Sequence, residues 1–140
     1  MSVLLFFFLS DSIYCLSDSM RIYLDACCLN RPFDDLSIDR NRFESEAVIS
    51  ILEHVRNKRW EWVSSSALTI ELEQAPSSSK KQQVREFLNL VKSIVVISSK
   101  ELVRRKELTA MGFKSFDAYH IAAAESGACD ILLTTDDAMI

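Results

Sequence analysis

The sequence predicts an α/β protein, a three-layer α/β/α fold with a central, mostly parallel sheet of four to five strands. Short apolar runs alternate along the chain with longer segments whose apolar residues recur at helical spacing. Helices that connect parallel strands through right-handed crossovers cover both faces of the sheet. The 140 residues contain no internal repeat and no low-complexity linker, so they predict one domain.

The elements are assigned from apolar periodicity, helix caps and turn residues. In chain order they are a strand at 21–25, a loop at 26–35, a helix from 39 to a basic patch at 56–59, a strand at 60–64, a helix at 67–74 after the capping residues 65–66, a helix beginning at 77–79, a strand at 94–97, a helix capped by 98–99 and ending near 112, a helix at 116–126 capped by Ser115, and a strand at 131–133.

Composition limits the classes of function. The chain has 16 Lys and Arg against 20 Asp and Glu, a net charge of -4, which excludes a long basic groove for duplexes. Any nucleic-acid contact must then be local or pass through a bound cation. The four cysteines follow no metal-binding spacing, so we expect reduced thiols and a cytoplasmic protein.

Residues 1–19 are interpreted as an accessory or spurious extension, and residues 20–140 as the domain. The apolar run at 3–9 makes a signal peptide the alternative interpretation, although no positive charge precedes it. The run is too short to span a bilayer, and no membrane association is expected.

Four acidic residues from distant parts of the chain are predicted to meet at one edge of the sheet. Asp25 ends the first strand, and Asp136 follows the last. The loops that leave parallel strands share one edge, where such folds bind ligands. Glu71 and Asp117 each lie on a helix whose N-terminus is at that edge. At 100° per residue Glu71 faces inward, whereas Glu73 points away.

Carboxylates so close together would take up protons unless a cation lay among them. Oxygen-only ligands favour Mg²⁺ or Mn²⁺ over zinc. Such a site suits the hydrolysis of phosphodiester bonds by metal-activated water. Alternatively, each acid is simply a solvated side chain near a loop.

The ordered motifs YLD at 23–25, SALTIEL at 66–72, FDAYHIA at 116–122 and LTTD at 133–136 resemble a PIN domain of the VapC type. The resemblance covers residues 20–140. It implies an α/β/α fold, a Mg²⁺- or Mn²⁺-dependent ribonuclease and an acidic quartet of Asp25, Glu71, Asp117 and Asp136, with Thr134 as a supporting hydroxyl. Ala26 stands where the family usually has Thr or Ser.

The family continues past its last acid into a closing strand, which residues 20–140 are therefore expected to lack. The resemblance also implies a toxin of a toxin–antitoxin pair. Its expected partners are an RNA substrate, an antitoxin protein and a second copy of the chain in a homodimer.

Several alternatives stay open. His120 is read as a metal ligand or general base, or as a packed, hydrogen-bonded residue. Cys27 or Cys28 with His120 suggests a thiol hydrolase, but no third orienting group is evident. An aspartyl-nucleophile phosphatase would need a second Asp at the position of Cys27. Three arginines either contact RNA phosphates or belong to a solvated surface. They are Arg31, Arg40 and Arg42.

An inactive, degenerate PIN-like protein-binding module is the main alternative from another class. In that reading, the last strand presents an open edge to a partner. Binding of a divalent metal would separate the two, because a nuclease needs it and a docking module does not.

Overall fold

The computed structural model describes residues 4–7, 20–76, 78–136 and 139. Of the segment 1–19, it therefore describes one short strand. The helices and strands in chain order are β1 (Leu4–Phe7), β2 (Met20–Leu24), α1 (Ala26–Asn30), the 3₁₀ helix η1 (Arg31–Phe33), α2 (Asp39–Arg56), β3 (Trp60–Ser65), α3 (Ser66–Glu73), α4 (Ser78–Leu88), β4 (Ser93–Val95), α5 (Ser99–Ala110), α6 (Ser115–Ser126) and β5 (Ile131–Thr134).

The strands form one sheet in the order β1-β5-β2-β3-β4. Four of them, β5, β2, β3 and β4, run parallel, and β1 pairs with β5 in the antiparallel sense. The central strand β2 places Ile22 between Trp62 of β3 and Ile131 of β5. The predicted α/β/α class with a mostly parallel sheet is confirmed.

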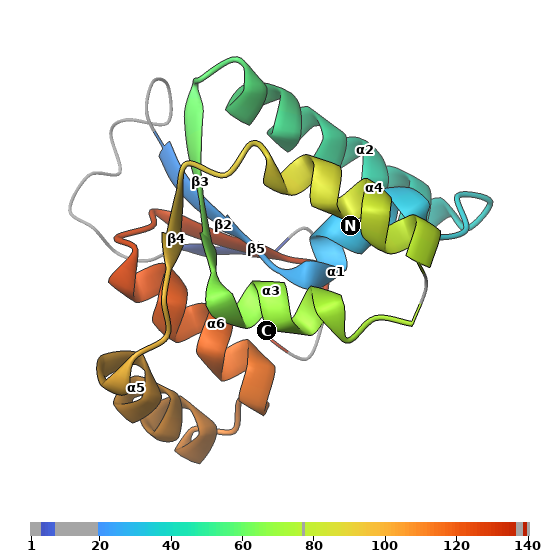
Figure 1. Ribbon diagram of the computed structural model, residues 1–140. Coiled ribbons are helices and arrows are strands. Elements are labelled where there is room, and N and C mark those ends of the chain that lie inside the picture. Colours follow the sequence, from blue (N-terminus) through green and yellow to red (C-terminus); the bar gives the residue numbers. More distant parts are fainter. Residues whose placement is uncertain (1–3, 8–19, 77, 137–138, 140) are drawn as a thin grey trace.

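Successive side chains of β2 serve opposite layers of the molecule, because strand residues alternate between the two faces of a sheet. Ile22 and Leu24 pack in the core formed with α1, α2 and α4. Tyr23 packs in the second core, with α5 and α6. Figure 1 shows α2 and α4 on one side of the sheet and α5 and α6 on the other, with α3 at the end of β3.

Three local predictions were wrong, each for a physical reason. The expected loop at 26–35 contains α1 and η1, and Pro32 lies at the start of η1, where its missing N–H breaks no helical bond. β4 ends at Val95, because the N–H of Ile97 donates to the Ser66 hydroxyl instead. Lys114, not Ser115, is the N-cap of α6, and the Ser115 hydroxyl accepts a bond from Arg105.

The edge of β5 is a further correction. The alternative of a docking module required this edge to be open, but β1 pairs along it from Leu4–Thr134 to Phe7–Ile131. In the described part of the sheet, the two edge strands are β1 and β4. None of the described helices is long and apolar enough to cross a membrane.

Candidate metal centre

The site begins where β2 gives way to α1. The backbone N–H of Asp25 still pairs with the carbonyl of Leu133 at 3.0 Å, and Asp25 is also the N-cap of α1. Its side chain is buried, with 4% of the residue exposed. The Thr134 hydroxyl donates to Asp25 Oδ2 at 2.9 Å, and the Cys27 thiol donates to the same oxygen at 3.3 Å. The strand end thus fixes Asp25 at the carboxyl edge of the sheet.

Thr134 also connects two of the predicted acids. Besides donating to Asp25, its hydroxyl accepts a hydrogen bond from the backbone N–H of Asp136 at 3.0 Å. Thr134, the last residue of β5, therefore links Asp136 to Asp25 at the end of β2. The Cys27 thiol also contacts the Thr134 hydroxyl, at 3.4 Å.

Glu71 reaches the site from α3, whose start is set by Ser65. The Ser65 hydroxyl accepts the N–H of Leu68 at 3.1 Å, which confirms the predicted cap. Glu71 Oε2 lies 2.6 Å from His120 Nε2. Asp25 Oδ1 lies 3.7 Å from the same nitrogen. Ligand atoms of Asp25, Glu71 and His120 all lie within 4.8 Å of one another.

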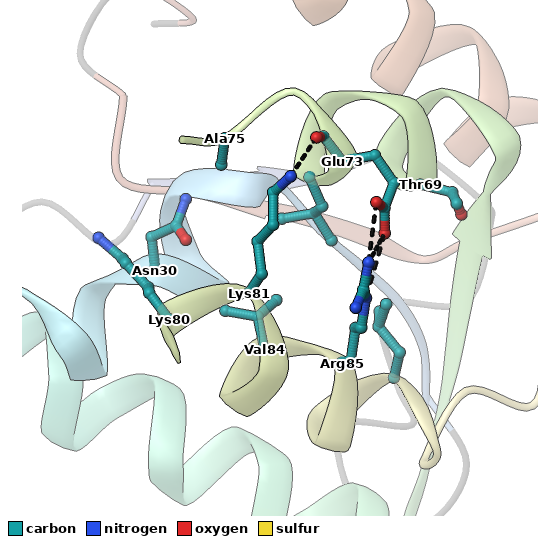
Figure 2. Close-up of a pocket in the computed structure, with 10 residues that line it drawn as sticks. Asn30, Thr69, Glu73, Ala75, Lys80, Lys81, Val84 and Arg85 are labelled. Carbon is teal, nitrogen blue, oxygen red and sulfur yellow. Dashed lines mark hydrogen bonds and ion pairs between the residues drawn. The ribbon is translucent and has the colours of Figure 1, made fainter. Parts of the chain in front are cut away.

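The opposite side of α3 holds its carboxylate differently. Figure 2 shows Glu73 facing α4, where Arg85 approaches both carboxylate oxygens. The two distances are 2.7 and 2.8 Å, and Lys81 donates to the Glu73 backbone carbonyl. The hydrogen bond to Arg85 is the main reason that the pKa of Glu73 is lowered. Glu73 therefore points away from Glu71, as its direction on the helix predicted, and Arg85 is its cation.

His120 is hydrogen-bonded through both ring nitrogens. Nδ1 lies 2.7 Å from the Tyr23 hydroxyl, which in turn lies 2.6 Å from the Ser65 hydroxyl. Burial opposes a charge on the ring, but the bond to Glu71 and the nearby carboxylates outweigh it, so the pKa of His120 lies above its ordinary value. An imidazolium donates from Nε2 to Glu71 and from Nδ1 to Tyr23. His120 thus orients Glu71, and its nitrogens have partners within the protein.

Asp117, in the first turn of α6, is buried and incompletely hydrogen-bonded. It is 8% exposed, and its Oδ2 is among the buried polar atoms without a hydrogen-bond partner in the described part of the chain. Burial, followed by the charges of Asp25 and Asp136, raises the pKa of Asp117 to about 6. The charges of His120 and Lys114 act in the opposite direction, but they do not outweigh burial and the neighbouring carboxylates.

The structure thus brings Asp25 and Glu71 together with His120, and Asp117 close enough to feel the charges of Asp25 and Asp136. Asp136 is partly exposed at the rim. In the described residues, His120 is the one basic side chain within ion-pair distance of Asp25 and Glu71. Even with His120 protonated, the three carboxylates Asp25, Glu71 and Asp117 leave excess negative charge, which a divalent cation would balance.

Sequence reasoning missed Tyr23 and Ser65. A signal was present, because Tyr23 alternates with Ile22 and Leu24 on a buried strand, and a buried Tyr hydroxyl usually finds a polar partner. The pattern could not show that this partner is His120, since β2 and α6 are separated by almost 100 residues.

Three kinds of comparison were made, and no protein-family model, curated protein or solved structure matches this chain.

Proposed function

We propose that this chain is a metal-dependent endoribonuclease of the PIN-domain type, which hydrolyses phosphodiester bonds of RNA. The observation that carries the proposal is Asp117, a buried carboxylate with an unpartnered oxygen, a pKa raised to about 6 and other carboxylates nearby. The carboxyl ends of parallel strands, where it lies, are the usual ligand-binding edge of such sheets.

The donor chemistry fits a hard cation. Asp25, Glu71, Asp117 and Asp136 offer carboxylate oxygens, and both nitrogens of His120 are already engaged. Oxygen ligands favour Mg²⁺ or Mn²⁺. When bound, either ion supplies charge stabilisation for phosphate oxygens and lowers the pKa of a coordinated water.

The residues of the chain have separate roles in this proposal. Asp25 and Asp117, the two buried carboxylates, hold the cation, and Asp136 closes the site at its rim. Glu71 has a side chain 32% exposed and is oriented by His120, so it is the carboxylate suited to orient the attacking water. Thr134 fixes Asp25 through its hydroxyl.

The biological setting belongs to the same proposal. We propose a toxin of the VapC type, with an antitoxin protein as its inhibitor, a homodimer as its assembly and the cytoplasm as its location. The alternative, a PIN-like module that binds a partner without cutting RNA, differs in one measurable property, because it needs no divalent metal.

The test is cleavage of single-stranded RNA with Mg²⁺ or Mn²⁺, and with a chelator as control. We expect metal-dependent cleavage by the wild type, and a loss on the order of 10³-fold in Asp25→Asn, since the substitution removes a charge that holds the cation. Circular dichroism should show an intact fold in the variant. Full activity of Asp25→Asn would refute the assigned site.

A further inference from the structure

Two adjacent cysteines of α1, Cys27 and Cys28, have different surroundings. Cys28 is 1% exposed, packs in the core with α2 and α4, and donates from its thiol to the carbonyl of Leu133 at 3.4 Å. Cys27 is partly exposed, and its thiol donates to Asp25 Oδ2 at 3.3 Å. The Cys28 thiol therefore belongs to the core, whereas the Cys27 thiol lies beside the candidate metal centre.

Cys27 is accessible from solvent through an open pocket of about 410 Å³. The pocket is lined by Cys27, Arg31, Arg40, Asn41, Thr135 and Asp136. Arg42, which pairs with Asp39 at 3.0 Å, lies outside it. A cation can therefore reach Cys27 Sγ from the pocket without any displacement of the core.

The arginines of this pocket do not leave it with a positive surplus. Buried Glu44 lies between them, with its Oε2 2.8 Å from Arg31 Nε and its Oε1 2.7 Å from Arg40 Nε. Asp136 lines the same pocket and adds a second negative charge. Two guanidinium groups thus face two carboxylates, so the approach to Cys27 is not closed to a cation by electrostatic repulsion.

The distance between Cys27 Sγ and Asp25 Oδ2 suits two ligands of one cation. Zinc bonds of about 2.3 Å to sulfur and about 2.1 Å to a carboxylate oxygen, at a tetrahedral angle, put the ligand atoms roughly 3.6 Å apart. The distance in the structure is 3.3 Å. The thiol proton lies between these two atoms, so a cation that replaces this proton requires only a small movement of either side chain.

The neighbouring hydrogen bonds hold both ligand atoms in place. The backbone N–H of Thr135 donates to Cys27 Sγ at 3.3 Å, and the Thr134 hydroxyl donates to Asp25 Oδ2 at 2.9 Å. Neither bond uses the thiol proton, so both persist when that proton is replaced. Partners of this kind orient metal ligands in proteins.

A third ligand oxygen is available at the same edge of the sheet. Asp117 is 8% exposed, and its Oδ2 has no hydrogen-bond partner within the described ranges of the chain. Asp25 and Asp117 are close enough for the charge of one to act on the other. The thiol of Cys27 therefore adjoins two carboxylates, one of which has an unused acceptor oxygen.

We propose that the metal centre also binds a thiophilic divalent cation of the zinc class, through Cys27 Sγ and Asp25 Oδ2, and that this cation excludes Mg²⁺ or Mn²⁺ and inhibits the enzyme. The inference rests on the proposed function, because both cations share Asp25. A thiolate selects zinc over the ions that prefer oxygen ligands. On binding, the S–H bond breaks, its proton passes to solvent and a sulfur–metal bond forms, without any change of oxidation state.

Ultraviolet titration of the metal-free protein with Cd²⁺ tests the inference, because a cadmium–thiolate bond has a charge-transfer band that oxygen ligands do not give. All proteins carry Cys15→Ser, so that only the described cysteines are compared. This reference protein should show a band that saturates at a single Cd²⁺ per chain.

Cys27→Ser should lose the band and bind Cd²⁺ about tenfold or more weakly, because even residues that only orient a metal ligand are worth about 10- to 100-fold in affinity. Cys28→Ser, the same change one residue away, should keep the band and the affinity. Asp25→Asn, in which Cys27 is intact, should also weaken Cd²⁺ binding about tenfold or more.

An unchanged band in Cys27→Ser would overturn the inference, as would equal Cd²⁺ affinity in Asp25→Asn and the reference protein. Circular dichroism checks each fold, and Cys27→Ala, with Cys28→Ala as control, replaces a serine variant that does not fold. The titration contains no RNA. A band that depends on Cys27, in a protein that does not cleave RNA with Mn²⁺, would therefore refute the proposed function and support this cation site.

Discussion

Two carboxylates with little exposed surface, Glu101 of α5 and Asp117 of α6, differ in their hydrogen-bond partners. Glu101 is 5% exposed and Asp117 is 8% exposed. Glu101 accepts bonds from the backbone N–H and hydroxyl of Ser98 and from the Ser126 hydroxyl, and they lower its pKa to about 2. Asp117 has an unpartnered oxygen and a pKa of about 6. Burial raises the pKa of both carboxyls, but at Glu101 the hydrogen bonds outweigh it and at Asp117 burial prevails.

The same contrast separates the two carboxylates of α3. Glu73 pairs with Arg85, whereas Glu71 shares one imidazolium with Asp25. Glu73, which has a cation to itself, serves the fold. Asp25 and Glu71 lie around a single imidazole, and with Asp117 we interpret them as the functional set.

Within this comparison, the largest effect is expected when each carboxylate of α3 is replaced in turn. Glu71→Gln should reduce RNA cleavage on the order of 10²-fold, because the water-orienting carboxylate is lost. Glu73→Gln, the same change two residues away, should leave cleavage within about twofold. Initial rates at saturating Mg²⁺ measure both. Similar losses in the two variants would remove the distinction between the sides of α3.

Asp117→Asn should stabilise the metal-free protein by about 1–2 kcal/mol at pH 7, because it removes a buried, uncompensated charge. The pKa of Asp117 is raised from 3.8 to about 6, so the folded state binds the proton more tightly than the unfolded chain does. Its contribution to stability is full below pH 3.8 and is lost as the pH rises through about 6.

Urea unfolding of the wild type and of Asp117→Asn between pH 4 and pH 7 measures this difference. The stability of the wild type should fall relative to that of the variant across the interval. A constant difference between the two proteins would show that Asp117 does not titrate there.

Glu101→Gln should have the smallest effect, a loss of about 1 kcal/mol at pH 7, since it weakens the capping box of α5 and the bond to Ser126. The pH dependence has the opposite sign. The pKa of Glu101 is lowered from 4.5 to about 2, so its contribution is full above pH 4.5 and is lost as the pH falls through about 2.

Acid unfolding followed by circular dichroism compares Glu101→Gln with the wild type. The stability gap between them should close as the pH falls from 4.5 toward 2. A difference in stability that persists at low pH would mean that the charge of Glu101 does not contribute to the stability of the fold.

Much of the fold followed from periodicity. The apolar spacing of α2 and the Ser98 and Ser65 caps lie within short windows of sequence, so local rules suffice for them. The antiparallel pairing of β1 with β5 was not predicted, because it joins segments more than 120 residues apart. The early end of β4 likewise depends on a distant partner, the Ser66 hydroxyl.

The placement of the acids followed from topology, since parallel strands end at a common edge. The hydrogen bonds around these acids did not follow from topology. That His120 bonds Glu71 and Tyr23 depends on the packing of α6 against α3 and β2, which no local pattern encodes. The separation of Arg40 from Arg42 was available from helical geometry, but the position of Glu44 between Arg31 and Arg40 required the structure.

The most direct test is calorimetric titration of Mn²⁺ into the metal-free protein at pH 7, above the pKa of Asp117. We predict that Mn²⁺ binds the wild type and Glu73→Gln with similar affinity and binds Asp117→Asn at least tenfold more weakly. The reason is that Asp117 belongs to the proposed metal-binding carboxylates, whereas Glu73 does not. No binding by the wild type, or equal binding by Asp117→Asn, would contradict the claim that these carboxylates form a metal centre.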